Sequence, residues 1–183
     1  MHSLLFSIWF FLPAGLANAS PVFANKISLI NWITTPLDFG KKYRGIRIFG
    51  DNKTWRGLIF GTLIGLLVIL LQIYGYHHSA WLRSISGGVI YNHSLILLGP
   101  LMGFGALLGD AIESFFKRQA RVKPGNTWFP FDQIDYIIGG LLFSLPVITL
   151  GVKYYFLILV VWLLLHLISS YIGYLLGLKT KPI

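Results

Sequence analysis

Four of the chain's six acidic residues stand close together in the sequence, with a spacing that favours metal binding. They are Asp110, Glu113, Asp132 and Asp135. Within each pair the carboxylates are three residues apart, so on a helix they share one face. Two such pairs at the facing ends of consecutive helices can converge on one hard divalent cation, which prefers oxygen ligands. The absence of cysteine, and of any histidine pair at ligand spacing, argues against zinc.

Basic residues lie between the two acidic pairs, an arrangement typical of a site for a metal-bound polyphosphate. In such a site the acids hold the metal while the bases hold the phosphate oxygens. The bases here are Lys117, Arg118, Arg121 and Lys123. Simpler interpretations stay open: a positively charged loop without a ligand, an i,i+4 helix pair between Glu113 and Lys117, or Asp132 as a helix cap.

An earlier polar segment, at 38–56, leads into an apolar run through Gly50-Asp-Asn-Lys-Thr-Trp-Arg-Gly57. Glycines with Lys53, Thr54 and Arg56 at the start of a helix can bind phosphate through backbone N–H groups and cationic side chains. The spacing of a Walker A loop is missing. A membrane anchor with a capping threonine is the competing interpretation.

The apolar composition places these polar segments at a membrane. The 183 residues are 55% hydrophobic and 11% charged, with a mean hydropathy of +0.70. A soluble domain carries about 25% charged residues, so the composition indicates an integral membrane protein. The length fits a single domain over residues 1–183. The net charge of +9 in so apolar a chain favours anionic lipids and nucleotides over nucleic acid as partners.

Five apolar runs approach the roughly 20 residues that a helix needs to cross a bilayer. They cover about 4–23, 58–74, 89–108, 134–150 and 154–176. Polar segments at 38–56 and 110–133 separate them. We therefore predict an all-α integral membrane protein with about five transmembrane helices and two polar loops.

Basic residues are distributed unevenly among the connections between these runs. The two polar loops and the C-terminal tail hold 12 lysines and arginines, whereas the connections on the other side hold Arg83 and Lys153; Lys26, near the first run, is assigned to neither side. The positive-inside rule then places both loops in the cytoplasm. We expect a multi-pass protein of the cell membrane with a cytoplasmic active site. The first run, followed by Ala17-Asn18-Ala19, is similar to a signal peptide, but no basic residue precedes it, and we expect a retained helix.

The motifs resemble those of membrane CTP:lipid-phosphate cytidylyltransferases. Ser114-Phe-Phe-Lys117-Arg118, Lys123, Phe129-Pro130 and Asp132-x-x-Asp135 follow the order of the phosphatidate enzymes. Pro124 stands where those enzymes have Asp, and a His-Gly-Gly segment is absent. These departures match a smaller family, the CDP-archaeol synthases. Its motifs correspond to Pro36-Leu-Asp38-Phe-Gly40, Gly50-Asp-x-Lys53-Thr-Trp-Arg-Gly57, Gly109-Asp110, Lys123-Pro-Gly125 and Asp132-Gln-x-Asp135, with Asn52 where a Gly is expected.

The resemblance implies an enzyme that transfers CMP from CTP to a membrane lipid phosphate, 2,3-bis-O-geranylgeranylglycerol 1-phosphate, and releases pyrophosphate. The expected Mg²⁺ ligands are Asp110, Asp132 and Asp135, with Glu113 as a further candidate. The expected triphosphate ligands are Lys53, Thr54, Arg56 and Lys123, with Lys117 and Arg118 as the catalytic cations. Basic character at the membrane edge suggests Lys41 and Arg44 for the lipid phosphate, with Asp38 and Asp51 as supports that orient these bases.

Two alternatives to this function stay open. A phosphatidate cytidylyltransferase with an ester-linked lipid would share all of these residues. A cation transporter or channel would also use membrane acids, but it would place charges near the middle of its helices. The interiors of the five apolar runs contain no such charges. For an enzyme, the lipid tails would lie between helices that open sideways to the bilayer.

Overall fold

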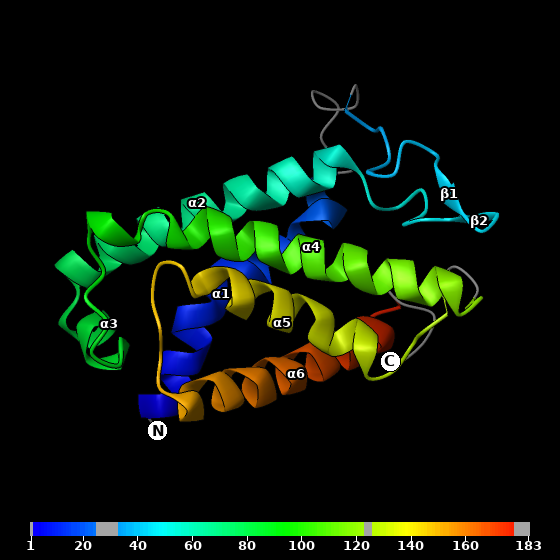
Figure 1. Ribbon diagram of the computed structural model, residues 1–183. Coiled ribbons are helices and arrows are strands. Elements are labelled where there is room, and N and C mark those ends of the chain that lie inside the picture. The colour runs from blue at the N-terminus through cyan, green and yellow to red at the C-terminus, as the bar shows by residue number, and fades with distance from the viewer. Residues whose placement is uncertain (1, 25–32, 123–125, 178–183) are drawn as a thin grey trace.

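The apolar runs form the helices of a membrane bundle (Figure 1). The computed structural model describes residues 2–24, 33–122 and 126–177. Four long helices are α1 (His2–Ala24), α2 (Trp55–His78), α4 (Leu98–Gln119) and α6 (Val152–Leu175). Shorter elements are α3 (Ala80–Ile85), the 3₁₀ turn η2 (His93–Leu95) and α5 (Phe131–Ser144). The strands β1 (Lys42–Tyr43) and β2 (Ile46–Arg47) form a small antiparallel hairpin in the first polar loop.

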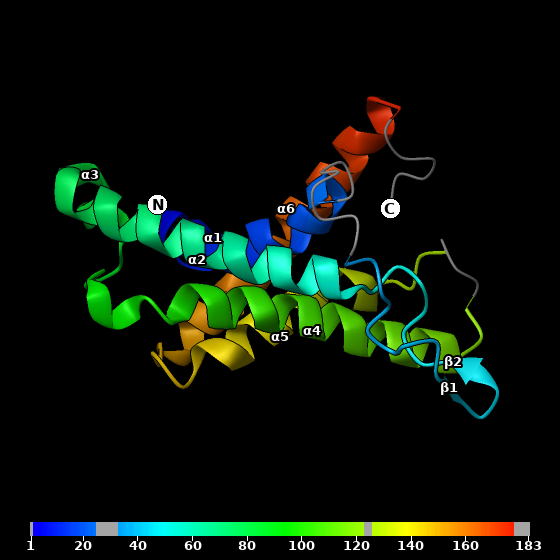
Figure 2. The ribbon, with the colours of Figure 1, turned by 90° about the horizontal axis from the view of Figure 1, so that it is seen from above.

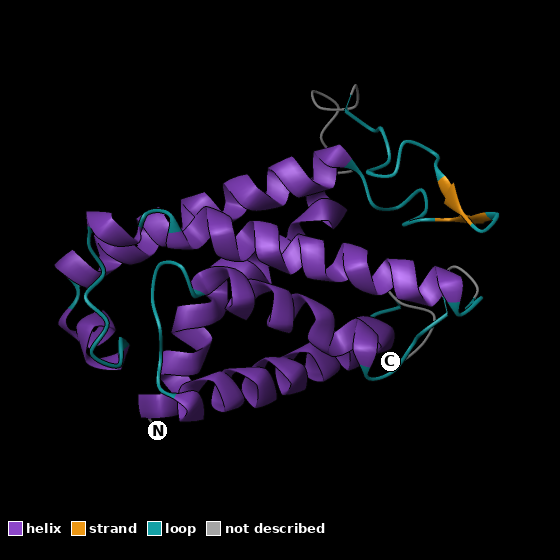
Figure 3. Cartoon of the chain, viewed as in Figure 1, coloured by secondary structure: helices purple, strands orange, loops and turns teal. Residues whose placement is uncertain are grey.

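The predicted all-α membrane fold is confirmed. Within the described residues, four helical segments are long and apolar enough to cross a bilayer: His2–Pro21, Trp55–His78, His93–Gln119 and Val152–Leu175. The remaining predicted span, the fourth at 134–150, corresponds to α5, which has 14 residues. That length is below the roughly 20 residues of a complete crossing, so this crossing stays a prediction. Figure 3 shows how little of the described chain lies outside helices.

The structure extends the third predicted span and shortens the fourth. The third apolar run was predicted to end at 108, but α4 continues to Gln119. Asp110 and Glu113 therefore lie within this helix, before its last turn, rather than at its end. The continuation is amphipathic, since Ile112 and Phe116 are exposed while Glu113 is buried. The predicted run ended before the first charged residue because it was defined by apolar side chains, whereas the helix continues through charged residues.

Glycines let three helices approach backbone to backbone. A Cβ atom on Gly65 of α2 would meet the carbonyl oxygen of Gly99 in α4 at 2.3 Å. On the other side of α4, a Cβ on Gly105 would meet the carbonyl oxygen of Gly139 in α5 at 2.5 Å. Small residues at such interfaces permit the close packing that holds helices together in lipid. Both neighbours of α4 are thereby fixed in register with it.

The core of the bundle lies around α1. Phe6, Phe10 and Phe11 of this helix are at most 1% exposed and belong to one cluster with Met102 of α4 and Ile137 of α5. The indole N–H of Trp162 in α6 donates to the carbonyl of Ser7, which ties α6 to the same helix. The first helix is therefore an integral part of the packed bundle.

The polar elements gather at one end of the bundle. Figure 1 places the β1–β2 hairpin beside the C-terminal end of α4, and α3 at the opposite end. Viewed from above in Figure 2, α6 diverges from α4 toward its C-terminal end. The two bases of the sparsely charged connections, Arg83 in α3 and Lys153 in α6, lie away from the hairpin. Among the described residues, the bases of the two polar loops therefore lie at the hairpin end of the bundle, and Arg83 and Lys153 lie away from it.

Candidate functional site

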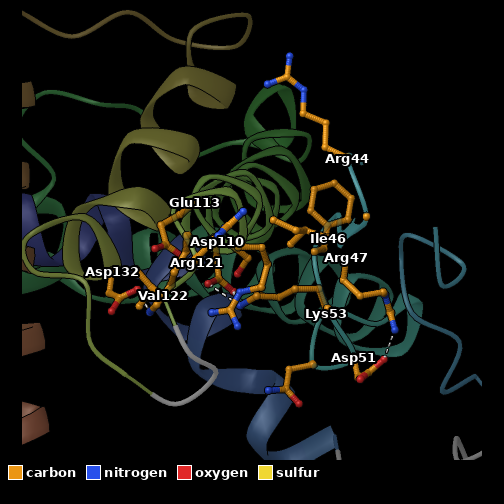
Figure 4. Close-up of a pocket in the computed structure, with 17 residues that line it drawn as sticks. Arg44, Ile46, Arg47, Asp51, Lys53, Asp110, Glu113, Arg121, Val122 and Asp132 are labelled. Atoms are coloured by element: carbon orange, nitrogen blue, oxygen red, sulfur yellow. Dashed lines mark hydrogen bonds and ion pairs between the residues drawn. The ribbon is translucent and has the colours of Figure 1, made fainter. Parts of the chain in front are cut away.

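A charged cavity of about 880 Å³ lies between the first polar loop and the C-terminal half of α4. Figure 4 shows its lining side chains, which come from the hairpin, the loop before α2, α4 and the start of α5. Its charged lining residues are Arg44, Arg47, Asp51, Lys53, Asp110, Glu113, Lys117, Arg118, Arg121 and Asp132. The six bases and four acids that line this cavity among the described residues are suited to an anionic ligand that carries a cation.

Three carboxylates converge beside this cavity, and two of them, Asp110 and Glu113, line it. One oxygen from each of Asp110, Glu113 and Asp135 lies within 4.8 Å of the others. We call these three residues the carboxylate trio. Asp110 and Glu113 share a face of α4, and Asp135 comes from α5. The two helices meet here because Gly109 has no side chain: a Cβ at that position would meet the carbonyl oxygen of Asp135 at 2.4 Å.

The donor set of the trio fits a hard divalent cation. All its ligand atoms would be carboxylate oxygens, the type that Mg²⁺ and Ca²⁺ prefer. Glu113 is 7% exposed, and its Oε1 has no hydrogen-bond partner among the described residues. A buried acceptor without a partner is costly, and a metal ion would satisfy it. Asp110, Glu113 and Asp135 are therefore the residues that could hold a metal.

Two lysines form ion pairs with acids of the site. Lys53 donates to both oxygens of Asp110 at 2.6 Å, which joins the first loop to α4. Lys117 donates to Asp132 Oδ1 at 2.5 Å, which joins α4 to the start of α5. Both pairs bridge segments that are far apart in the sequence. Each lysine thus lies within reach of an anionic ligand while neutralising a carboxylate.

Asp132 lies beside the trio rather than within it. Its Oδ1 accepts from Lys117 and its Oδ2 accepts from the backbone N–H of Trp128 at 2.6 Å. Its carboxyl group also neighbours Glu113. Asp132 was expected before Glu113 as a metal ligand, whereas the geometry brings Glu113 into the set of three. The proposed i,i+4 pair of Glu113 with Lys117 is replaced by the pair of Lys117 with Asp132.

Asp38 is buried and organises the first polar loop. Its side chain is fully shielded and accepts hydrogen bonds from the backbone N–H groups of Gly40, Phe49 and Gly50, and from Arg47 at 2.8 Å and 3.2 Å. Burial alone would raise the pKa of Asp38. The Arg47 guanidinium and the three N–H groups outweigh that effect and hold its pKa well below the usual range.

Arg47 is the base that the two acids of this loop orient. Its guanidinium donates to Asp38 and also to Asp51 at 2.6 Å. Arg47 lines the cavity, although the sequence analysis did not single it out. Its spacing of four residues from Asp51 was the only sequence signal, and the pairing with Asp38 depends on the hairpin turn. Asp38 and Asp51 thus support a base, as expected, but a different base from those named.

The structure places the other predicted site residues differently from one another. Arg118 and Arg44 line the cavity, and the Arg44 side chain points away from Lys53 and Asp110 in Figure 4. Thr54 caps α2, because its hydroxyl accepts from the backbone N–H of Gly57 at 3.2 Å. Lys41 and Arg56 are not among the described lining residues. Lys123 lies outside the described residues.

Fold and site together define a helical integral membrane protein whose acid–base cavity is suited to a metal-bound polyphosphate. The chain belongs to the CDP-archaeol synthase family: the family model described as CarS-like, CDP-archaeol synthase, matches residues 1–183. The CDP-archaeol synthase of Pyrococcus furiosus is 38% identical over 185 residues, which cover 100% of this chain and 99% of that protein. That of Methanocaldococcus jannaschii is 34% identical and covers 97% of each chain.

A solved structure of an intramembrane enzyme for archaeal membrane lipids biosynthesis is similar to this fold. The TM-score is 0.67 at 28% identity, over 89% of this chain and 91% of that one. The comparisons confirm the family resemblance and the expected class of enzyme, a nucleotidyltransferase that uses CTP. The cation transporter alternative is left without support.

Proposed function

We propose that this protein transfers CMP from CTP to 2,3-bis-O-geranylgeranylglycerol 1-phosphate in a Mg²⁺-dependent reaction that releases pyrophosphate. The observation that carries the proposal is the position of the carboxylate trio, of which Asp110 and Glu113 line the same cavity as Lys53, Lys117, Arg118 and Arg121. Acids that hold a cation and bases that hold phosphate oxygens are the two requirements of nucleotidyl transfer. Membership of the CDP-archaeol synthase family supports the choice of nucleotide and of an archaeal lipid phosphate.

The proposed reaction needs positioning and charge neutralisation more than proton transfer. A lipid phosphate is ionised near neutral pH, so its oxygen attacks the α-phosphorus of CTP without a general base. The new bond joins this oxygen to the α-phosphorus, and the bond from the α-phosphorus to the bridging oxygen of the β-phosphate breaks. Pyrophosphate leaves with the electron pair. Bound Mg²⁺ would supply charge neutralisation on the triphosphate and on the leaving group.

The residues of the chain then have distinct proposed roles. Asp110, Glu113 and Asp135 hold the cation, and Asp132 positions Lys117 through their ion pair. Lys117 and Arg118 are the catalytic cations beside the triphosphate, and Lys53 is a further phosphate ligand. Arg44 lines the cavity and points away from Lys53 and Asp110 (Figure 4), so its proposed role is to attract the lipid phosphate rather than to hold the triphosphate. We place this end of the bundle in the cytoplasm, because the bases gather there.

CDP-lipid formation by the purified protein in detergent tests the proposal. The reaction contains CTP, MgCl₂ and either the ether-linked lipid phosphate or an ester-linked phosphatidate of matched chain length. Product from the ether lipid alone is the expected result. Product from phosphatidate alone would identify the ester-linked lipid as the substrate instead. No CDP-lipid from either would contradict the function.

The variant Asp135→Asn tests the role of the trio in the same assay. It should lower turnover by at least about 100-fold, because one charged ligand of the cation is lost. Ser84→Ala, an exposed substitution in α3 at the other end of the bundle, is the matched control and should retain turnover. Full turnover by Asp135→Asn would remove this residue from the metal site.

A further inference from the structure

A second cavity adjoins the charged one and has the opposite character. It has a volume of about 600 Å³ and lies between α4 and α5. Of the described residues that line it, Glu113 and Asp135 alone carry a charge, and both belong to the carboxylate trio. We call this cavity the α4–α5 groove. Glu113 lines both cavities, so the apolar groove begins where the site of phosphate chemistry ends.

The shape of the groove follows from the close packing of its two helices. Gly105 and Gly109 of α4 lie against Gly139 of α5, with backbone atoms so close that no side chain can stand between them. The larger side chains stand on either side of this contact, including Ile112 on α4 and Leu142 on α5. The result is a groove with a floor of backbone and two apolar walls.

The length of the groove corresponds to one leaflet of a bilayer. Along α5 its lining runs from Phe131 to Phe143, a rise of about 18 Å at 1.5 Å per residue. One leaflet contributes about 15 Å, half of the roughly 30 Å hydrocarbon core. Phe143 stands at the far end, with its ring 5.4 Å from that of Phe104. The groove therefore has the length of a lipid chain whose polar end remains at the membrane surface.

We propose that the α4–α5 groove binds one hydrocarbon chain of the acceptor lipid and thereby places the lipid phosphate beside Glu113 and Asp135. This inference rests on the proposed function and adds to it the helices that select the substrate. Exposed apolar side chains are expected on every lipid-facing helix. This groove differs from them because its charged end is formed by two members of the carboxylate trio, Glu113 and Asp135. A groove one helix interface wide holds a single chain, and the second chain remains in the bilayer.

Substitutions that fill the groove test the proposal. Ile138→Trp and Leu142→Trp lie one helical turn apart on α5, and both native side chains line the groove and are partly exposed, at 43% and 57%. Each methylene that an indole displaces weakens binding by about fourfold. The KM for the long-chain lipid phosphate should therefore rise at least about tenfold. The KM for CTP should stay within about twofold, since the charged cavity is untouched.

Matched controls are available on α2. Leu63→Trp and Leu67→Trp have the same spacing and similar exposure, at 55% and 51%, and these residues line neither cavity. Both should retain the wild-type KM for the lipid. A short-chain lipid phosphate gives a second control, because it does not reach Leu142. Leu142→Trp and the two α2 variants should turn over the short-chain acceptor as the wild type does, which separates a filled groove from a damaged site.

Photolabelling gives a readout that does not depend on turnover. A long-chain lipid phosphate with a diazirine near the chain end should label α5 around Leu142 and Phe143, and the same chain without a phosphate should label it weakly. Unchanged lipid KM in both α5 variants, or label confined to other helices, would overturn the inference. Equal labelling by the chain without phosphate would also overturn it. Labelling of the groove without CDP-lipid formation would instead contradict the proposed function alone.

Discussion

The ammonium group of Lys53 lies 2.6 Å from both carboxylate oxygens of Asp110. Lys53 belongs to the loop before α2, and Asp110 belongs to α4. Asp110 is also a member of the carboxylate trio. One lysine thus neutralises a proposed metal ligand and draws the first polar loop over the cavity. Binding of a cation to the trio would compete with this ammonium group.

Replacing Lys53 should separate cation binding from nucleotide binding. In Lys53→Met the trio loses a competing positive charge, so the nucleotide-free protein should bind Mn²⁺ several-fold more tightly. A charge–charge interaction of about 1 kcal/mol, as expected at a partly exposed site, corresponds to a change of this size in affinity. Turnover should nevertheless fall at least about tenfold, because a phosphate ligand is lost. Electron paramagnetic resonance of free Mn²⁺ measures the first effect. Lys117→Met is the control, because Lys117 pairs with Asp132, which lies outside the trio. This variant should change the Mn²⁺ affinity less. Weaker Mn²⁺ binding by Lys53→Met would show that Lys53 does not compete with the cation.

The buried carboxylate of Asp38 should stabilise the loop that carries Lys53. Asp38→Asn removes the charge that faces Arg47 and three backbone N–H groups. Breaking a buried pair of this kind costs about 3 kcal/mol or more, so both the unfolding temperature and the turnover should fall. Asp51→Asn replaces an acid whose side chain is 81% exposed. It should change the free energy of unfolding by no more than about 1 kcal/mol. Equal effects of the two substitutions on thermal unfolding would contradict this ranking.

The stabilisation by Asp38 should depend on pH in a defined direction. Its pKa is depressed in the folded protein, so the unfolded chain binds the proton more readily. The contribution is therefore complete above the unfolded pKa of about 3.9 and is lost as the pH falls through the lower folded value. The difference in unfolding temperature between wild type and Asp38→Asn should be constant from about pH 7 to pH 5 and should narrow below about pH 4. A difference that widens in acid would show the opposite sign.

The positions of the long membrane helices and the spacing of acids within one helix could be predicted from the sequence. Apolar runs of about 20 residues have few alternatives to membrane helices, so α2 and α6 lie close to their predicted bounds. The pairing of acids three residues apart also held for Asp110 and Glu113, because a helical repeat fixes it. These features depend on neighbours in sequence.

Contacts between distant segments could not be predicted in the same way. The pairs of Lys53 with Asp110 and of Arg47 with Asp38 depend on where a loop settles over α4. The choice of Glu113 over Asp132 for the trio depends on the rotation of α5 against α4, which the Gly109 contact fixes. One sequence gives no information on such a rotation, since several glycines could have formed the interface.

Gly109 should set the distance between the two helices that build the trio. In Gly109→Ala the new Cβ would meet the Asp135 carbonyl oxygen at 2.4 Å, well inside van der Waals contact, so α4 and α5 must separate. Turnover should fall by about 100-fold, as expected for misplacing catalytic groups by about 1 Å, and the Mg²⁺ concentration for half-maximal activity should rise. Gly151→Ala is the control, because the nearest atom to its Cβ is 3.9 Å away. Normal activity and Mg²⁺ dependence in Gly109→Ala would show that the approach of the helices is not required.

Glu113 and Asp132 should have different effects on cation binding, although they are neighbours. Glu113 contributes an oxygen to the trio and has a buried Oε1 without a partner among the described residues. Asp132 is already satisfied by Lys117 and by the Trp128 N–H group. Glu113→Gln should therefore weaken Mn²⁺ binding at least about tenfold. Asp132→Asn should change Mn²⁺ binding by only a few-fold, and it should alter the KM for CTP because Lys117 loses its ion-pair partner. Titration of both variants with Mn²⁺, with and without CTP, measures the two effects. If Asp132→Asn weakens Mn²⁺ binding more than Glu113→Gln does, Asp132 is the ligand and α5 must rotate when the cation binds.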